Sequence, residues 1–242
     1  MTRKRADVVL VERGFFTSRA RAQEAIAAGL VTVNGTVIRK ASDTVPEEAV
    51  ITAEQPHPYV SRGGVKLAAA LDIFQIDPKG LVCLDLGAST GGFTEVLLKR
   101  DAAHVYAVDV GHGQIHPTIA ADPRVTNLEG TDARSLSTDL IPEPIDLLVS
   151  DVSFISLKLV LPPVIPLLKP HAVMAVLVKP QFEAGRDNVK KGIVRDAAVH
   201  RAVCEDMTAF VQSLGFEPMG IVPSPIEGGD GNREFLLGAR RG

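Results

Sequence analysis

The stretch that decides the fold is "GLVCLDLGASTGGFTEVLLKRDAAHVYAVDV", residues 80–110. It contains an apolar strand, a glycine-rich turn, an amphipathic helix and a second apolar strand, which together predict a βαβ unit. The glycines do not follow the dinucleotide fingerprint G-x-G-x-x-G, because Ser89 stands where a glycine is required and the actual glycines are Gly87, Gly91 and Gly92. The sequence therefore predicts an α/β domain whose ligand differs from a dinucleotide.

Acidic residues follow the ends of the predicted strands. Asp85 ends the first strand, where it would repel a pyrophosphate and suit a cationic ligand. Asp109 ends the second strand, where a carboxylate accepts both hydrogen bonds of a ribose diol. A third candidate strand, "RVTNLEGTDAR", places Asp132 at the same edge. These positions predict a ligand that carries a positive charge and a ribose.

This arrangement resembles the S-adenosylmethionine site of Rossmann-like methyltransferases. The resemblance implies that the glycine-rich turn passes the methionine part, that Asp109 holds the ribose and that Asp132 lies at the adenine end. A glycine-rich turn in an unrelated α/β fold is the alternative. The residues implied in cofactor binding are Asp85, Gly87, Ala88, Ser89, Thr90, Gly91, Gly92, Phe93, Asp109 and Asp132.

Three further segments bring reactive side chains to strand ends. The strand in "IDLLVSDVSFIS" ends at Asp151, and the buried strand in "HAVMAVLVKPQFEAG" runs into Lys179. The segment "GNREFLLGARR" puts Glu234 at the start of a final strand. Methyltransferases that act on base amino groups usually carry Asp or Asn, two prolines and an aromatic residue after the equivalent strand. The sequence Asp-Val-Ser-Phe at residues 151–154 disfavours that chemistry.

A fourth segment, "PHPYVSRGGVKLAAAL", residues 56–71, joins a proline-broken run to a predicted helix. Leu67, Ala70, Leu71 and Phe74 have the spacing of an apolar helical stripe, and Ser61 is placed to cap the start. Lys66 and Arg62 then fall in the first turn, where the helix dipole disfavours cations. By itself this position is also compatible with two solvated basic residues beside a linker.

The two lysines acquire a role when they are considered together. If Lys66 meets Lys179, mutual repulsion favours one neutral amine, while Asp151 and Glu234 set orientation and net charge. A neutral lysine accepts the proton of a ribose hydroxyl, which is too weakly acidic to attack a methyl group unaided. Amine substrates need no such base. The set therefore favours an oxygen nucleophile.

Lysine, aspartate, lysine and glutamate in this chain order resemble the catalytic tetrad of FtsJ/RrmJ-type ribose 2′-O-methyltransferases. Together with "YVSRGGVKL", "DLGASTGGFTEVLL", "SDVSFIS", "VKPQFE" and "GNREF", they make the chain similar to the TlyA family. The resemblance implies methylation of cytidine ribose in ribosomal RNA. Lys179 would be the general base, Lys66 and Asp151 its electrostatic and orienting partners, and Glu234 a substrate-side orienter. Family members that act on both ribosomal subunits tend to have a C-terminal extension, so the ending "LLGARRG" favours the large subunit.

The N-terminal segment predicts a small α+β domain. A helix begins at Thr17 or Ser18 and stops at Gly29, and a tight hairpin turns at Asn34-Gly35. With "ADVVLVERGFFTSRARAQEAIAAGLVTVNGTVI" it resembles the S4-like RNA-binding domain. Residues 1–40 carry eight Lys or Arg against three acids, which favours a polyanionic partner. The implied RNA contacts, unless they are only solvated cations, are Arg3, Lys4, Arg19, Arg21, Arg39 and Lys40.

The predicted organisation is an S4-like RNA-binding domain at 1–53, a linker at 54–60 and a Rossmann-like, FtsJ/RrmJ-like methyltransferase domain at 61–242. The two cysteines lie far apart, which favours a reduced, cytoplasmic setting. No secretory signal is evident, and the most apolar segment is broken by prolines, so no membrane partner is expected. His112 and His116 are separated by a glycine and lack a third ligand, so no metal is expected. A monomer is expected.

Two other functions remain as alternatives. Proteins similar to the TlyA family have been called hemolysins, but no spanning or pore-forming segment is predicted. An RNA-binding protein with an inactive methyltransferase fold is the second, and the presence of all four tetrad residue types argues against it. The charged loop "FEAGRDNVKKGIVRD", residues 182–196, follows Lys179 and is either a lid, an RNA contact or an ordinary solvated loop.

Overall fold

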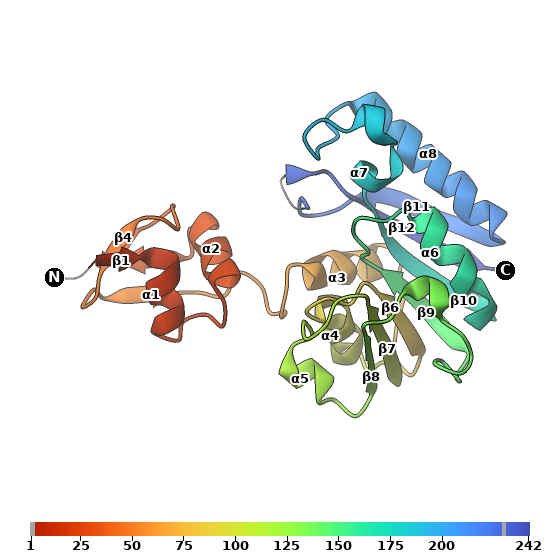
Figure 1. Ribbon diagram of the computed structural model, residues 1–242, viewed down its shortest axis with the longest axis horizontal. Helices are drawn as coiled ribbons and strands as arrows, with labels where there is room; N and C mark the ends of the chain where they lie inside the picture. Colours follow the sequence, from red (N-terminus) through yellow and green to blue (C-terminus); the bar gives the residue numbers. More distant parts are fainter. Residues whose placement is uncertain (1–2, 229–230) are drawn as a thin grey trace. The chain divides into compact units, whose positions relative to one another are not determined.

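The chain divides into two compact units, Met1–Pro58 and Tyr59–Gly242. A computed structural model describes residues 3–228 and 231–242, and Figure 1 draws both units. The predicted linker, residues 54–60, lies on both sides of the division. Each unit has its own core and is described by itself.

The first unit packs two helices against short strands. Their bounds are β1 Arg3–Arg5, α1 Ala6–Glu12, α2 Arg19–Ala27, β2 Val31–Val33, β3 Thr36–Val37, β4 Thr44–Pro46 and β5 Ile51–Ala53. Strand β1 pairs with β4, and β2 lies between β3 and β5. Two local predictions are confirmed: the Ser18 side chain accepts a hydrogen bond from the Arg21 amide at the start of α2, and Asn34 and Gly35 both have positive φ at the hairpin turn. The core of the unit is formed by apolar residues from both helices and from β2, β4 and β5.

The second unit is built around a seven-stranded sheet of order β11-β12-β10-β9-β6-β7-β8. The strands are β6 Val82–Leu86, β7 His104–Asp109, β8 Val125–Glu129, β9 Ile145–Ser150, β10 Leu168–Val178, β11 Phe216–Pro223 and β12 Phe235–Arg241. The helices are α3 Gly63–Ile73, α4 Gly92–Lys99, α5 Pro117–Ala120, α6 Leu157–Val164, α7 Pro180–Glu183 and α8 Ala197–Ser213. Strands β8, β7, β6, β9 and β10 are parallel, while β12 runs antiparallel to both β10 and β11. The predicted Rossmann-like α/β class is confirmed.

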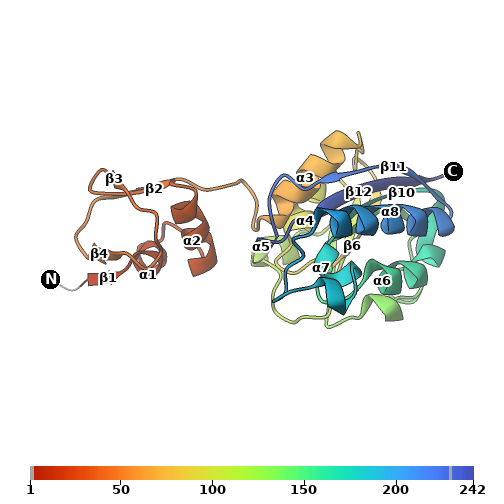
Figure 2. The same ribbon diagram turned by 90° about the horizontal axis from the view of Figure 1, so that it is seen from above.

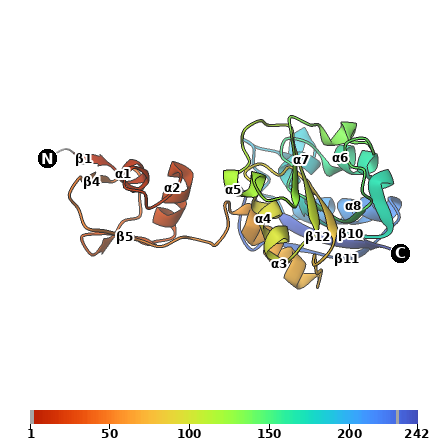
Figure 3. The same ribbon diagram turned by 90° about the horizontal axis from the view of Figure 1, so that it is seen from below.

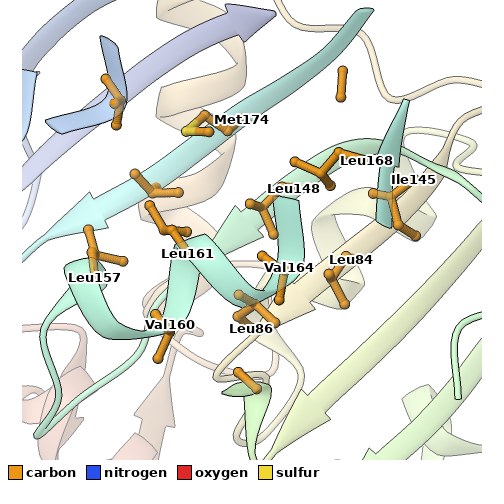
Figure 4. Packing of buried hydrophobic residues seen from close by; sticks show 14 of the residues in the cluster. Leu84, Leu86, Ile145, Leu148, Leu157, Val160, Leu161, Val164, Leu168 and Met174 are labelled. Carbon is orange, nitrogen blue, oxygen red and sulfur yellow. The ribbon is translucent and has the colours of Figure 1, made fainter. Parts of the chain in front are cut away.

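Helices cover both faces of this sheet, as Figures 2 and 3 show from opposite sides. Helices α3 and α4 pack on one face, and α6 and α8 pack on the other. The central strands are almost continuously apolar, because a parallel sheet that is buried on both faces has no side that faces water. Figure 4 shows the α6 side, where Leu157, Leu161 and Val164 meet Leu148 and Met174 of the sheet.

The strand register gathers three of the four predicted catalytic residues, together with Gly87 of the turn, at one edge. Leu86 of β6 pairs with Ser150 of β9, and Val178 of β10 pairs with Phe235 of β12. The residues just beyond these pairs are Gly87, Asp151, Lys179 and Glu234. Because β12 is antiparallel, its start lies at the edge where the parallel strands end.

The start of α3 differs from the prediction. The helix begins at Gly63 after Arg62, which makes no side-chain cap, so Ser61 is not the capping residue. The Ser61 carbonyl accepts the Gly64 amide at 3.1 Å, and a Cβ on Gly92 would overlap the Ser61 hydroxyl. The hydroxyl is therefore packed against the start of α4 and is not turned back to its own helix. The predicted apolar stripe of α3 is buried.

Candidate active site

The glycine-rich turn between β6 and α4 is shaped by close backbone contacts. Gly87 has φ 81°, and a Cβ on it would lie 3.0 Å from backbone atoms of Asp151 and Val152. Gly91 caps α4 with φ 92°. At Gly87, only a residue without a side chain allows both the positive φ and the close approach to the Asp151–Val152 backbone. The turn can therefore pass directly against the segment that follows β9.

A pocket of about 190 Å³ opens beside this turn. The start of α3, the turn, and the segments after β9 and β10 contribute its walls. It is lined by Ser61, Gly63, Gly87, Ala88, Ser89, Thr90, Gly92, Phe93, Asp151, Ser153 and Lys179. Most of the residues predicted to bind the cofactor thus share one pocket with two of the residues predicted to be catalytic.

Lys179 forms an ion pair with Asp151 in this pocket. The lysine Nζ lies 2.7 Å from Asp151 Oδ1, and the side chains are 8% and 20% exposed. Nζ also donates to the Ser153 hydroxyl at 2.7 Å and to the Asp151 carbonyl at 3.3 Å. Three oxygens therefore compensate the removal of the ammonium from water. Sequence reasoning missed Ser153, although its place two residues after Asp151 at a strand end is a signal of the right kind.

Lys66 and Glu234 form a second ion pair away from the pocket lining. Lys66 Nζ lies 2.6 Å from Glu234 Oε2, with side chains 9% and 3% exposed. A Cβ on Gly228 would overlap the Glu234 carboxylate, so the chain before β12 also encloses this acid. The sequence left open whether the two lysines meet or have carboxylate neighbours, and the structure gives each lysine its own carboxylate. Burial explains this outcome, because a buried amine without a counter-charge costs several kcal/mol.

Asp85 is fully buried behind the turn and does not line the pocket. Burial is the main cause that raises the pKa of Asp85 to about 7, with smaller contributions from the charges of Asp151 and Asp109. The Thr94 hydroxyl donates to Oδ2 at 2.7 Å and opposes this shift. Oδ1 has no hydrogen-bond partner among the described residues. The predicted direct contact with a cationic ligand is thus not available in this arrangement.

The other two predicted acids differ in how their oxygens are used. Asp109 accepts the Ser89 amide at 2.8 Å and the Gly111 amide at 2.7 Å, one bond on each oxygen. Each carboxylate oxygen has a second lone pair, so the acid retains acceptor capacity for a diol. Asp132 is instead held by Arg134 at 2.6 Å, and this bond lowers the pKa of Asp132 to about 2. Sequence reasoning missed this arginine, two residues after the acid.

Phe154 is an exposed aromatic residue next to the Lys179 pair. Its side chain is 90% exposed, its φ is 65°, and its ring centroid lies 5.3 Å from that of Phe182. A positive φ is unfavourable for a bulky residue and is found mostly at functional sites. Exposed rings in such a place suit the stacking of a nucleic-acid base. Sequence reasoning used Phe154 only to exclude amine chemistry.

The predicted RNA-contacting cations of the first unit are partly organised by acids. Arg19 and Arg5 both bind the buried carboxylate of Asp7, and the Arg5 hydrogen bond keeps the pKa of Asp7 far below its usual range. Arg21 donates to Gln55 Oε1 at 2.8 Å. Lys4 pairs with Glu12, whereas Arg3, Arg39 and Lys40 are exposed. Sequence reasoning missed Arg5 and Asp7, which fix where Arg19 lies.

Residues 3–228 and 231–242 hold no group of three or more His, Cys, Asp or Glu side chains that would bind a metal. In the same ranges, no helix is both long and apolar enough to cross a bilayer.

Two family models match the chain and cover most of it. Residues 59–241 match the FtsJ-like methyltransferase family, and residues 4–51 match the S4 domain. The match boundaries agree with the division into two units.

Relatives extend this likeness over nearly the whole length. The 16S/23S rRNA (cytidine-2'-O)-methyltransferase TlyA of Mycobacterium tuberculosis is 43% identical over 98% of this chain and 90% of its own. Hemolysin A of Brachyspira hyodysenteriae is 38% identical over 96% of this chain and 98% of its own. A solved structure from Streptococcus thermophilus, assigned as a hemolysin, is 39% identical with a TM-score of 0.79, covering 100% of this chain and 89% of that one. The resemblance drawn from the sequence motifs is confirmed.

Proposed function

The chain belongs to the FtsJ-like methyltransferase family and carries an N-terminal S4 domain, and from this premise we propose that it methylates the 2′-hydroxyl of a cytidine in ribosomal RNA with S-adenosylmethionine. The observation that carries the proposal is the Lys179–Asp151 pair, which shares one pocket with the glycine-rich turn. A base beside a methyl-donor site is what an alcohol nucleophile needs. The name of the mycobacterial relative supports cytidine in ribosomal RNA as the substrate.

The residues beside the pocket fit S-adenosylmethionine. When bound, this cofactor supplies an electrophilic methyl group on a sulfonium. The backbone from Gly87 to Thr90 lines the pocket without large side chains, which leaves room for the methionine part. Asp109 retains acceptor capacity for the ribose, and the negative charges of Asp151 and Asp109 favour a cation in the pocket.

Lys179 is the proposed general base. Its Nζ takes the proton of the 2′-hydroxyl as the oxygen attacks the methyl group, and the resulting ammonium is held by Asp151 and Ser153. The bound cofactor would supply a positive sulfonium that becomes neutral on methyl transfer. The proton taken by a neutral Lys179 would then restore the positive charge that Asp151 and Ser153 hold in the structure.

Lys66 and Glu234 are proposed as positioning residues. Their ion pair joins α3 to the segment before β12 and does not line the pocket. It fixes the elements that hold Ser61 and Gly63 on one side and the end of β10 on the other. This differs from the role implied by resemblance for Glu234, which would orient the substrate directly.

The first unit is proposed to dock the ribosomal RNA. Phosphate contacts from Arg3, Arg19, Arg39 and Lys40 would supply affinity without reading sequence. The hemolysin name of one relative is the basis of a second function, but the polar pocket gives it no support. Action on ribosomal RNA implies a cytoplasmic location.

The proposal is tested by locating the transferred methyl group. Purified protein is incubated with tritiated S-adenosylmethionine and with separated small or large ribosomal subunits from cells that lack the modification. The RNA is digested to nucleosides, and we expect the label in 2′-O-methylcytidine. Lys169→Ala, which removes a partly exposed ion pair with Asp146, serves as the matched control for Lys179→Ala.

Label on a base, or equal labelling by Lys179→Ala and Lys169→Ala, would contradict the proposal. No label from either subunit would favour an RNA-binding protein with an inactive fold. The subunit that is labelled identifies the substrate range.

A further inference from the structure

A second groove lies on the methyltransferase unit, between α8 and the strands β11 and β12. Figure 1 shows α8 running beside these strands. The groove has a volume of about 350 Å³. Arg201 and Cys204 of α8 line one side, Ile221 and Pro223 of β11 the other, and Arg233 and Phe235 the end near β12. None of these residues has a role in the function proposed above.

The groove combines an apolar floor with a cationic rim. Ile221 and Phe235 are half-buried and Pro223 is exposed, and Arg201 and Arg233 are exposed beside them. Among the residues that the structure describes, neither guanidinium makes a salt bridge or a side-chain hydrogen bond. By contrast, Arg124 and Arg240 each pair with an acid. Arg201 and Arg233 therefore each keep the five N–H donors of the guanidinium available for a ligand.

The groove adjoins the catalytic edge of the sheet. Arg233 directly precedes Glu234, whose side chain points inward to Lys66. Phe235 pairs across the sheet with Val178, the residue before Lys179. The groove therefore lies beside the strand ends that carry Lys179 and Glu234.

Hydrogen bonds hold this segment in place. The Asn232 side chain donates to the Gly192 carbonyl at 3.0 Å and accepts the Val194 amide at 3.4 Å. The ring of His200 on α8 contacts the Val194 carbonyl at 3.0 Å. The loop around Val194 therefore ties α8 to the residue before Arg233, so both sides of the groove are positioned in advance.

We propose that this groove holds a nucleotide of the RNA substrate next to the methylated one. Its phosphate binds the guanidinium groups of Arg201 and Arg233, which suit two-pronged recognition of phosphate. Its base rests on the apolar floor against Phe235 and Pro223. Charge selects this occupant, because a polyanion compensates two cations beside one acid, Glu205, in the lining. The inference rests on the proposed RNA substrate and adds a subsite to it.

The first test is kinetic and uses the double variant Arg201→Ala/Arg233→Ala of the full chain. The matched control is Arg240→Ala, an exposed arginine of β12 that pairs with Glu217. We expect the KM for ribosomal RNA to rise about tenfold or more in the double variant, because charge-assisted hydrogen bonds to the phosphate are lost. The kcat should change little. The slope of log KM against log salt should fall by about one to two. Equal KM values for the double variant and Arg240→Ala would overturn the proposal.

The second test is a footprint at Cys204, which needs no substitution. Cys83 is fully buried, so a maleimide reagent reports mainly on Cys204 in the groove. Burial raises the pKa of the Cys204 thiol to about 11, so alkylation is slow and is compared at one fixed pH. We expect the ribosomal subunit that the protein methylates, added in its unmethylated form, to slow alkylation of Cys204 several-fold. S-adenosylhomocysteine alone should have no effect.

The two tests separate the failure of this inference from the failure of the proposed function. If the wild type methylates ribose while RNA leaves the alkylation rate of Cys204 unchanged, the groove is not an RNA subsite. If the wild type fails to methylate ribose in either subunit, the proposed function fails first, and the subsite falls with it.

Discussion

Two lysine–carboxylate pairs lie at the same edge of one sheet, but they differ in what surrounds them. Lys179 and Asp151 line the pocket with Ser153, whereas Lys66 and Glu234 are enclosed between α3 and the segment before β12. Both pairs have short N–O distances, 2.7 and 2.6 Å. We therefore propose that access to the pocket distinguishes the pair that takes part in chemistry from the pair that holds elements together.

The difference between the two pairs is tested most directly by removing the Lys179 side chain. We expect Lys179→Ala to lower kcat by about 10²- to 10⁴-fold, the usual contribution of a general base. Binding of S-adenosylmethionine, measured by calorimetry, should change little, because the glycine-rich turn is intact. A kcat within twofold of that of Lys169→Ala would show that the pocket pair is not required for chemistry.

Removing one member of the enclosed pair should act on folding. We expect Lys66→Met to lower the free energy of unfolding by about 3–5 kcal/mol, because Glu234 would be left buried without a counter-charge. The double variant Lys66→Met/Glu234→Leu should recover most of this loss. Urea denaturation of the two single variants and the double variant gives the coupling energy. Additive losses would mean that the two side chains do not depend on each other.

The outcome for these pairs shows what sequence reasoning reaches. Asp151, Lys179 and Glu234 could be placed at one edge, because strand ends and chain order follow from apolar patterning. Lys66, on a predicted helix, joined them only through the resemblance of the four residues to the catalytic tetrad. Their pairing could not be predicted. The partner of Lys66 depends on β12 running antiparallel and on α3 packing over its start, which are facts of tertiary structure. Local rules failed at Ser61 for the same reason, since its hydroxyl is packed against Gly92.

Phe154 sharpens the contrast on the substrate side of the pocket pair. We expect Phe154→Ala to weaken RNA binding by about 1–3 kcal/mol, the usual value of base stacking on an aromatic ring. Stability should be nearly unchanged, because the ring is 90% exposed. The control is Leu159→Ala, because Leu159 is also an exposed apolar residue but lies on α6. Equal RNA affinity of the two variants by filter binding would exclude stacking at Phe154.

Asp85 extends the comparison to a buried acid without a lysine partner. Its pKa is raised from the usual 3.8 to about 7, so between these values the folded state binds a proton that the unfolded state releases. Stability of the wild type should therefore fall as pH rises from 4 to 7 and then level off. Asp85→Asn keeps an acceptor for Thr94 and lacks this loss. We expect its advantage in urea midpoint to grow across that pH range, and a constant difference would contradict the shift.

Positions such as Asp85 and Phe154 mark the limit of sequence reasoning. Asp85 was predicted to end its strand but lies one residue inside the end of β6, and its full burial depends on how α4 covers the strand through Thr94. The exposure of Phe154 depends on a positive φ that no local residue preference predicts. For both residues the type of side chain indicated a site, but the burial of Asp85 and the exposure of Phe154 could not be predicted from the sequence.

The central claim is that Lys179 removes the proton from the attacking hydroxyl. The most direct test is the single-turnover rate of methyl transfer at saturating RNA, measured against pH for the wild type and Lys179→Ala. The wild-type rate should rise about tenfold per pH unit wherever Lys179 is protonated, and the variant should be slow and insensitive to pH. A variant whose rate follows the wild-type pH profile would contradict the claim.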